Sequence, residues 1–463
     1  MITVIVPILL LLVIVLVPKI PYIGGKVSVA LIVAGIAALI MGGFYNPVNW
    51  FLAWIDGIDR IAWVMLLALV GCIYAETQIE IGTLDTVLRS LRAKFGHSPR
   101  GLVACTMIAL GLAGALLGEA IASATIVGIL AVKSMDELGL NGDLICAILV
   151  IGGSMGSVMP PISQAIFLSA SLLNVNPDVV VNHAYLTIGI GVIFTISFVC
   201  FVYIKKDLKF DESLIPKETA WEILSKNWIT LVPLTILTVL IIFRSLPIAS
   251  LQFDLVPSML NTITVAGKPF LTWLGGILIL KGFTNGIVLT MLFVSLLTLF
   301  FPVVRKNIKR ILTRGLKSVW ACTSVQLAAA VMLGGFYAGG QIEAVKAFAQ
   351  TLNANVIKIG GSAAMSLMGM LTGSQATAQN TIFSFFGPIL MDMGYTAGQA
   401  GIIGSHMAAA GQGLPPADLV TFAVAGVVGG ILGRKIDPLK SMLYSSVFCF
   451  YLIVVSFIYL YLL

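Results

Sequence analysis

Two short segments hold the small and polar residues that are best suited to binding a ligand. The first, Gly118–Thr125, precedes Pro160-Pro161, and the second, Gly373–Asn380, precedes Pro415-Pro416 at the same distance along the chain. The offset from Gly118 to Gly373 therefore equals the offset from Pro160 to Pro415, which predicts an internal repeat. Hydroxyls, carboxamides and exposed backbone groups of this kind bind cations and small polar solutes.

Each Pro-Pro pair follows a glycine-rich stretch and predicts a break in a helix. Proline removes backbone donors, so carbonyls of the preceding turn lose their helical partners and, with Ser and Thr hydroxyls, suit Na⁺. The half-helix that restarts after each break points a partly positive N-terminus at the same place, which suits a carboxylate. A cation site beside an anion site is what sodium–carboxylate symport requires. The helix-break residues are Pro160, Pro161, Pro415 and Pro416.

The candidate ligands fall into two groups. The predicted ion-binding residues are Gly118, Glu119, Ser123, Gly153, Ser154, Ser157, Gly373, Gly411 and Gly413. The predicted substrate-binding residues are Ser163, Gln164, Ser374, Gln375, Thr377, Asn380, Gln412 and Asp418. An intramembrane carboxylate is costly and therefore a functional candidate, although Glu119 and Asp418 could equally cap the next half-helix. Hydroxyls such as that of Ser123 have the alternative of bonding to the preceding turn.

The composition places these segments in a membrane. Of 463 residues, 59% are hydrophobic and 10% are charged, against roughly 45–50% and about 25% in soluble proteins. Too few charges remain to solvate a globular surface, which excludes a soluble enzyme, a disordered protein and a nucleic-acid binder. The six cysteines include no CxxC pair and the three histidines have no metal-ligand spacing, so we expect no cofactor other than Na⁺.

Apolar runs long enough to span a bilayer, about 20 residues each, define the predicted elements. They lie near 2–17, 27–44, 61–78, 144–173, 184–204, 227–246, 284–304, 319–338, 401–431 and 441–462. Two further regions, 101–137 and 356–392, are interrupted midway, and halves of about 16 residues are too short to cross. We therefore predict re-entrant hairpins, each preceded by an amphipathic helix at 82–95 or 340–353.

The basic residues predict the orientation. With the first residues outside, the loops at 18–26, 82–100, 205–226, 305–318 and 433–440 fall inside, as does the exit of the first hairpin near Lys133. Only six of the 27 Lys and Arg residues then lie outside: Arg60, Arg244, Lys268, Lys281, Lys346 and Lys358. This bias follows the positive-inside rule. The two halves consequently enter from opposite faces, which is an inverted-topology repeat. The stretch 247–283 is ambiguous and is interpreted as an external loop with a short re-entrant or interfacial segment.

At these motifs the sequence resembles the large membrane (M) subunit of tripartite ATP-independent periplasmic (TRAP) transporters, within the ion transporter superfamily. The arm helix, the Gly118 tip and Gly152-Gly-Ser-Met-Gly-Ser-Val-Met-Pro-Pro161 follow in that family's order, and Gly411-Gln-Gly-Leu-Pro-Pro416 matches in the second half. Two features depart from the pattern. Glu119 intrudes in the first tip and admits proton coupling, and the second tip is rich in amides.

The resemblance implies an all-α integral membrane protein that works as an elevator-type permease. It implies Na⁺-driven uptake of an organic acid across the bacterial inner membrane, with a small four-span membrane subunit and a periplasmic substrate-binding protein as partners. Scaffold spans are expected at 1–81, 175–338 and 433–463, and transport segments at 82–174 and 339–432. A stand-alone symporter or proton-coupled carrier is the alternative. A membrane enzyme or a channel would need a clustered catalytic set or a filter sequence, and the sequence shows neither.

Overall fold

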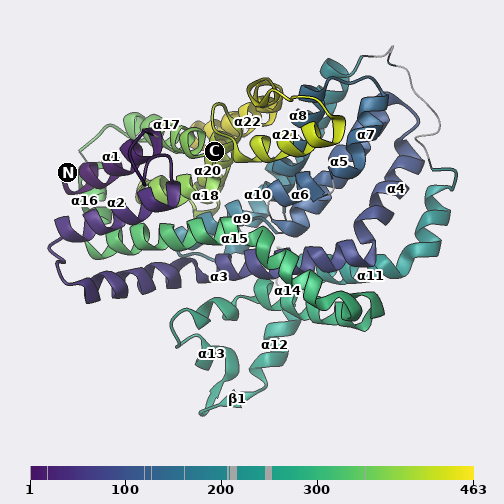
Figure 1. Cartoon of the computed structure of the whole chain (residues 1–463). Coiled ribbons are helices and arrows are strands. Elements are labelled where there is room, and N and C mark those ends of the chain that lie inside the picture. Colours follow the sequence, from purple (N-terminus) through teal and green to yellow (C-terminus); the bar gives the residue numbers. More distant parts are fainter. Residues whose placement is uncertain are drawn as a thin grey trace.

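The computed structural model describes residues 2–17, 19–118, 120–126, 128–160, 162–205, 208, 216–245, 253–349 and 351–462. Helices dominate, and Figure 1 shows them arranged around two very long ones, α3 (Pro47–Ile81) and α15 (Pro302–Ala338). A two-stranded ribbon, β1 (Thr264–Val265) with β2 (Lys268–Pro269), is the exception to the all-α prediction. The described chain is therefore a mostly helical protein with a small β element.

The long helices α3 and α15 pack side by side in opposite directions. Arg310 near the start of α15 pairs with Glu80 near the end of α3 at 2.5 Å, and Arg60 lies 3.7 Å from the ring centroid of Tyr337 at the opposite end. α2 (Val27–Met41) packs on α15, and α1 (Ile2–Leu16) packs on α2. Gly57 and Gly35 let these backbones approach, since a Cβ at either position would collide with the backbone of α15.

The first half of the chain continues with an amphipathic helix and a broken span, as predicted. The helices are α4 (Thr83–Phe95), α5 (Pro99–Leu117), α6 (Ala120–Ile126), α7 (Ile129–Glu137), α8 (Gly142–Val158), α9 (Gln164–Leu172) and α10 (Pro177–Phe198), which ends in the π-helical turn η1 (Val199–Tyr203). α5 and α6 pack against each other and on α8. The break between α8 and α9 falls at the first Pro-Pro pair.

The second half repeats these boundaries. Its helices are α16 (Gln341–Ala349), α17 (Ala354–Thr372), α18 (Gln375–Ala378), the π-helical turn η6 (Gln379–Phe383), α19 (Ser384–Asp392), α20 (Ala397–Gly413), α21 (Leu419–Leu432) and α22 (Pro438–Tyr461). α3, α5 and α8 begin at Pro47, Pro99 and Gly142, and α15, α17 and α20 begin at Pro302, Ala354 and Ala397. The same offset separates the two starts in every pair, and it is the offset of the sequence repeat. The break between α20 and α21 falls at the second Pro-Pro pair.

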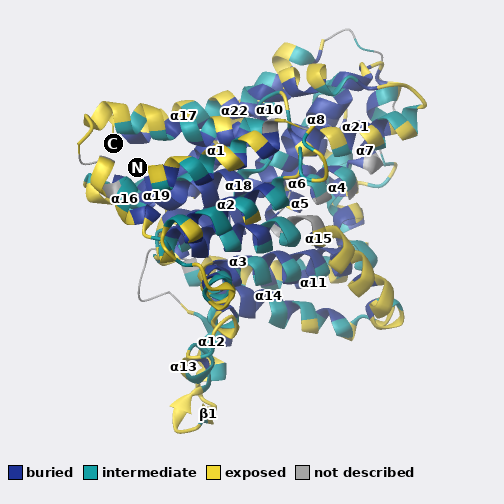
Figure 2. Cartoon of the chain, turned by 60° about the vertical axis from the view of Figure 1, so that its left-hand side comes forward, coloured by how far each residue is buried: buried dark blue, intermediate teal, exposed yellow. Residues whose placement is uncertain are grey.

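Two predicted loops are different in the structure. The basic stretch 305–318 is not a loop but the first part of α15, because Pro302 starts a helix that continues through it into the apolar span. The described part of 247–283 contains α12 (Leu255–Asn261), the β ribbon, α13 (Phe270–Leu274) and the 3₁₀ turn η4 (Leu280–Thr284). This segment projects from the helical body, and its ribbon is among the exposed parts in Figure 2.

Several helices are long and apolar enough to cross a membrane. By length and composition, five described helices qualify: α3, α10 with η1, α11 (Ala220–Ser245), α17 and α22. α15 adds a sixth if its two parts, bent by 44°, form one span. α1, α2, α8, α21 and α14 (Gly286–Leu297, followed by the 3₁₀ turn η5, Thr298–Phe300) are apolar but shorter. The chain is therefore a multi-pass membrane protein.

α5 and α17 are each 19 residues long, more than the sequence predicts for the first arm of each hairpin. At 1.5 Å per residue this is about 28 Å, close to the thickness of the hydrocarbon core. Length alone therefore does not separate a hairpin arm from a span here. What the structure adds is the place where these helices end.

Candidate functional site

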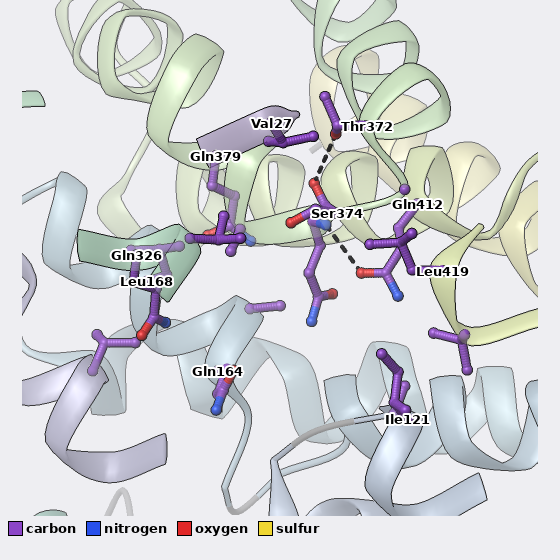
Figure 3. Close-up of a pocket in the computed structure, with 18 of the residues that line it drawn as sticks. Val27, Ile121, Gln164, Leu168, Gln326, Thr372, Ser374, Gln379, Gln412 and Leu419 are labelled. Carbon is purple, nitrogen blue, oxygen red and sulfur yellow. Dashed lines mark hydrogen bonds between the residues drawn. The ribbon is translucent and has the colours of Figure 1, made fainter. Parts of the chain in front are cut away.

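A cavity of about 440 Å³ lies where the tips and breaks of both halves meet α2, α3 and α15 (Figure 3). The breaks contribute residues from α9, α20 and α21, the tips contribute residues from α6, α17 and α18, and Val27 and Val64 come from α2 and α3. Apolar side chains form most of its wall. The polar residues that line it are Thr125, Gln164, Ser318, Gln326, Thr372, Ser374, Gln375, Gln379 and Gln412.

Glycines end the two helices that run to the cavity. Gly118 after α5 and Gly373 after α17 both have left-handed backbone, with φ of 66° and 62°. Only glycine adopts this conformation readily, so it turns the chain sharply at each tip. A Cβ on Gly373 would also collide with the carbonyl oxygen of Ala417. The second tip is thus pressed against the second helix break.

Hydrogen bonds hold the second tip in place. Ser374 caps α18 by accepting a hydrogen bond from the Thr377 backbone N–H at 3.2 Å. The Gln375 backbone N–H donates to the Gln412 side-chain oxygen at 3.0 Å, which joins the tip to the end of α20. These contacts use donors that a helix N-terminus would otherwise offer to a ligand.

Five predicted residues meet in the cavity wall: Gln164, Gly373, Ser374, Gln375 and Gln412. Two predicted substrate ligands, Thr377 and Asn380, are buried but do not line it. The helical period explains the position of Thr377, since Gln375 and Gln379 are one helical turn apart and share a face, and Thr377, two residues from each, lies on the opposite face. Both residues still carry side-chain polar atoms with no hydrogen-bond partner among the described residues.

Three of the predicted hydroxyl ligands of the first half are bonded to backbone. Ser123 donates to the Ala120 carbonyl at 3.0 Å, Ser157 to Ser154 at 2.9 Å, and Ser163 to Ser157 at 2.9 Å. Ser163 thereby occupies a carbonyl that the first Pro-Pro pair leaves without a helical donor. Ser154 and Ser157 also line a second cavity, of about 10 Å³, beside Gln375 and Gln412. A space of this size holds about one water molecule.

The predicted ion-site glycines serve close helix packing. A Cβ on Gly153 would meet the Ala120 carbonyl and Ala124 of α6, and a Cβ on Gly411 would meet Ser366 of α17. On Gly413 it would meet the sulfur of Cys449 in α22. Each glycine therefore brings two helices together. Pro160, Pro415 and Pro416 lie in the breaks, whereas Glu119 and Pro161 lie outside the described residues.

Asp418 caps the half-helix after the second break. Its carboxylate is fully buried and accepts hydrogen bonds from the backbone N–H groups of Val420 and Thr421, at 3.0 and 3.2 Å, and from the Thr421 hydroxyl at 2.5 Å. Ser163 holds the equivalent position in the first repeat and caps α9 with a hydroxyl, which accepts from the Ile166 N–H at 3.3 Å. Within the described part of the chain, no Lys, Arg or His pairs with Asp418.

The cavity wall is electrically neutral as far as the structure describes it. None of the described lining residues carries a formal charge, and Ser163, Ser374 and Asp418 cap α9, α18 and α21. The predicted carboxylate site at helix N-termini has no support in this geometry. His406 lies elsewhere, with its two ring nitrogens 3.0 Å from the Thr187 hydroxyl and 3.2 Å from that of Ser405. The described residues include no group of three His, Cys, Asp or Glu suited to a metal.

Two glutamines of the site were not predicted. Gln326 lies in the middle of α15, in the expected scaffold, and Gln379 lies within the second tip segment, one helical turn after Gln375. A glutamine within an apolar span is the signal that could have identified Gln326. Ser318 and Thr372 were not predicted either. They become neighbours of the cavity only because α15 packs against the tips.

Residues 1–206 match the model of the Na⁺/H⁺ antiporter family. The match covers less than half of the 463 residues. No curated protein matches the chain.

Two solved transporters share the fold over almost the whole chain. The YdaH transporter of Alcanivorax borkumensis aligns with a TM-score of 0.56 and 15% identity, over 89% of this chain and 87% of that one. MtrF of Neisseria gonorrhoeae, described as illuminating a class of antimetabolite efflux pumps, aligns with a TM-score of 0.60 and 13% identity, over 94% of each chain. At these identities the likeness shows the fold.

The resemblance to the TRAP M subunit is therefore wrong. The family model and both structural neighbours point to other transporters. Glycine and Pro-Pro end helices through local backbone chemistry, so these motifs do not identify one transporter family.

The expected partners are also wrong. A small four-span subunit and a periplasmic binding protein were implied by the TRAP resemblance alone, and the comparisons remove that basis. The chain has the fold of two membrane transporters, and its first 206 residues are similar to the Na⁺/H⁺ antiporter family.

Proposed function

We propose that this chain is a stand-alone secondary transporter that couples the movement of a small solute to Na⁺ or H⁺. The observation that carries the proposal is the cavity of about 440 Å³ between α3 and α15 on one side and both tips and both helix breaks on the other. Secondary transporters place their solute and ion sites at such junctions of broken helices.

An inverted repeat is part of the proposal, and contacts along α22 support it. At the start of α22, Asp143 of α8 accepts a hydrogen bond from the Asp437 N–H at 2.8 Å. At its end, the Leu460 carbonyl accepts hydrogen bonds from Lys358 of α17 and from Tyr395, which precedes α20. α22 has 24 residues and is about 36 Å long. The start of α8 in the first half and the start of α20 in the second half thus lie near opposite ends of α22.

An elevator motion follows from how the helices are grouped. The helices form three groups. The first consists of α1, α2, α3 and α15, the second of α5, α6, α8 and α21, and the third of α17, α18, α20 and α22. We assign the first set to a scaffold and the other two to a transport domain that carries the cavity wall across the membrane. The basic-residue bias supports a bacterial inner-membrane protein with residue 2 outside.

Asp418 is the proposed coupling residue. A buried carboxylate without a basic partner is costly in a membrane unless a proton or a cation neutralises it. Capping alone does not need a charge, since Ser163 performs the equivalent cap with a hydroxyl. The similarity of residues 1–206 to the Na⁺/H⁺ antiporter family supports Na⁺ or H⁺ as the ion.

Plain Na⁺/H⁺ exchange is the second candidate function, because the family model favours it. The cavity argues for a solute, since about 440 Å³ falls within the usual range for small-molecule sites. A single Na⁺ or proton needs no space of this size.

Purified protein without any added subunit tests the proposal in liposomes. The liposomes contain either buffer or the small-molecule fraction of a yeast extract, and ²²Na⁺ uptake and a trapped pH dye report ion movement. We expect ion flux above protein-free liposomes, with a rate that depends on the filling. Flux in buffer alone that the extract does not change would favour plain exchange, and no flux under any condition would reject the transporter.

Asp418→Asn separates the charge from the cap. Asparagine caps a helix about as well as aspartate, so we expect a folded protein whose ion flux falls at least about tenfold, the loss of one strong charge-assisted interaction. Ser163→Asn is the matched control at the equivalent cap and should keep its ion dependence. Normal flux in Asp418→Asn would reduce Asp418 to a helix cap.

A further inference from the structure

We infer that the cavity takes a compact, uncharged solute that carries an amide-like group, with a hydrogen-bond donor and an acceptor side by side. This inference rests on the proposed function and names its solute class. It replaces the organic acid expected from the sequence. The evidence is a pair of unpartnered glutamine atoms, the neutral wall and the apolar remainder of the lining.

Gln326 and Gln379 face the cavity from different parts of the molecule. Gln326 lies on α15 with 2% of its surface exposed, and Gln379 lies in η6 with 0% exposed. Among the described residues, the Gln326 side-chain oxygen and the Gln379 side-chain nitrogen have no hydrogen-bond partner. The Gln379 oxygen is already used, at 3.4 Å from the Ser169 hydroxyl.

These two atoms require complementary partners. A buried carbonyl oxygen needs a donor and a buried amide N–H needs an acceptor, and leaving either unpaired costs roughly 1–3 kcal/mol. An amide group of a solute offers both in one plane. Because Gln326 belongs to the proposed scaffold and Gln379 to the proposed transport domain, such a solute would join the two.

The neutral wall selects against a charged solute. A carboxylate in the cavity would meet carboxamides and hydroxyls but no described basic side chain, and a buried anion without a counter-charge is strongly disfavoured. The N-termini of α9, α18 and α21 compensate little, since Ser163, Ser374 and Asp418 cap them. The apolar residues, among them Leu168, Val325 and Leu419, fit an aromatic or aliphatic body.

Isosteric probe pairs test this inference on the purified protein. Benzamide and benzoate, and likewise nicotinamide and nicotinate, have nearly the same shape and differ in charge. Binding is measured by calorimetry and by the shift of the unfolding temperature. We expect each amide to bind at least about tenfold more tightly than its carboxylate partner, the usual cost of one unpaired or mismatched buried polar group. Carboxylates that bind as well as, or better than, the amides would overturn the inference.

Two variants locate the binding. Gln326→Leu and Gln379→Leu should each weaken amide binding about tenfold or more. Gln341→Leu is the matched control, because Gln341 is also buried with an unpartnered side-chain oxygen but does not line the cavity. Amide binding that survives both cavity substitutions would also overturn the inference. Binding needs no ion flux, so loss of amide selectivity with normal ion flux rejects only the solute class.

Discussion

Equivalent residues of the two halves perform the same structural role with different chemistry. Ser163 and Asp418 are equivalent positions of the repeat and both cap the half-helix after a break, one with a hydroxyl and the other with a carboxylate. The tips differ in the same way, since Gly118 leaves room where Gly373 is in tight contact. The fold repeats, whereas four of the five carboxamides that line the described cavity wall, Gln326, Gln375, Gln379 and Gln412, lie in the second half.

At the residue scale, Gly373→Ala should disturb the second tip. Alanine at a φ of 62° costs roughly 1–2 kcal/mol, and its methyl group would collide with the Ala417 carbonyl. We expect a lower unfolding temperature and reduced ligand binding. Gly360→Ala on the same helix is the control, because a Cβ there meets nothing within 4 Å. Equal stability of the two variants would show that the tip tolerates a side chain.

The helices begin and end at the same positions in both halves because the sequence contains residues that start and stop helices. Pro47 and Pro302 start the two long helices, and Ser98 and Asn353 cap the two 19-residue helices that end in glycine. Packing against other helices then decides where each helix lies. Thr83 of α4 lies 2.6 Å from the Thr230 carbonyl of α11, which docks an amphipathic helix that could otherwise lie on a bilayer surface.

At the element scale, the two halves should be reached from opposite sides. Lys133 in α7 and Asn355 in α17 are exposed, so cysteines placed there should react with a membrane-impermeant maleimide. In intact cells we expect labelling of Asn355→Cys and protection of Lys133→Cys, with the reverse in inside-out vesicles. The described native cysteines Cys72, Cys105, Cys146, Cys200 and Cys449 are buried and should give a low background. Labelling of both positions from one side would rule out the inverted arrangement.

The whole molecule places the cavity at the contact between two groups of helices. Trp63 of α3 donates to the Ser171 hydroxyl at 3.0 Å and packs on Phe167, with 5.4 Å between the ring centroids. These contacts join the proposed scaffold to α9, which packs on α20 of the proposed transport domain. In an elevator they must break and form again, whereas contacts within the scaffold can stay.

At the scale of the whole molecule, a cross-link across this contact should stop transport. We expect the pair Trp63→Cys with Ser171→Cys to lose ion flux when a short reagent joins the two cysteines through a disulfide at each end. Reduction of these disulfides should restore the flux. The pair Arg60→Cys with Tyr337→Cys joins α3 to α15 within the scaffold, where the native side chains are in contact, and should remain active. Full activity with Trp63 and Ser171 linked would contradict an elevator motion.

Much of the architecture could be predicted from the sequence, because it depends on local chemistry. The lack of charge places the chain in lipid, the prolines place the helix breaks, and the glycines place the ends of α5 and α17. The stretch 305–318 was misassigned because its basic residues resemble a loop, although nothing in it interrupts a helix. Family membership was misassigned because different transporter families end helices with the same motifs.

The site itself depended on tertiary structure. The sequence determined by itself that small and polar residues gather at two tips and two breaks, since their spacing is the same in both halves of the chain. It could not determine that Gln326 of α15 faces the same cavity as Gln379, that Asp418 is already bonded as a cap, or that Thr377 and Asn380 lie outside the cavity wall. The physical reason is that burial and hydrogen bonding are properties of neighbours brought together from distant parts of the chain, and a cavity exists only between them.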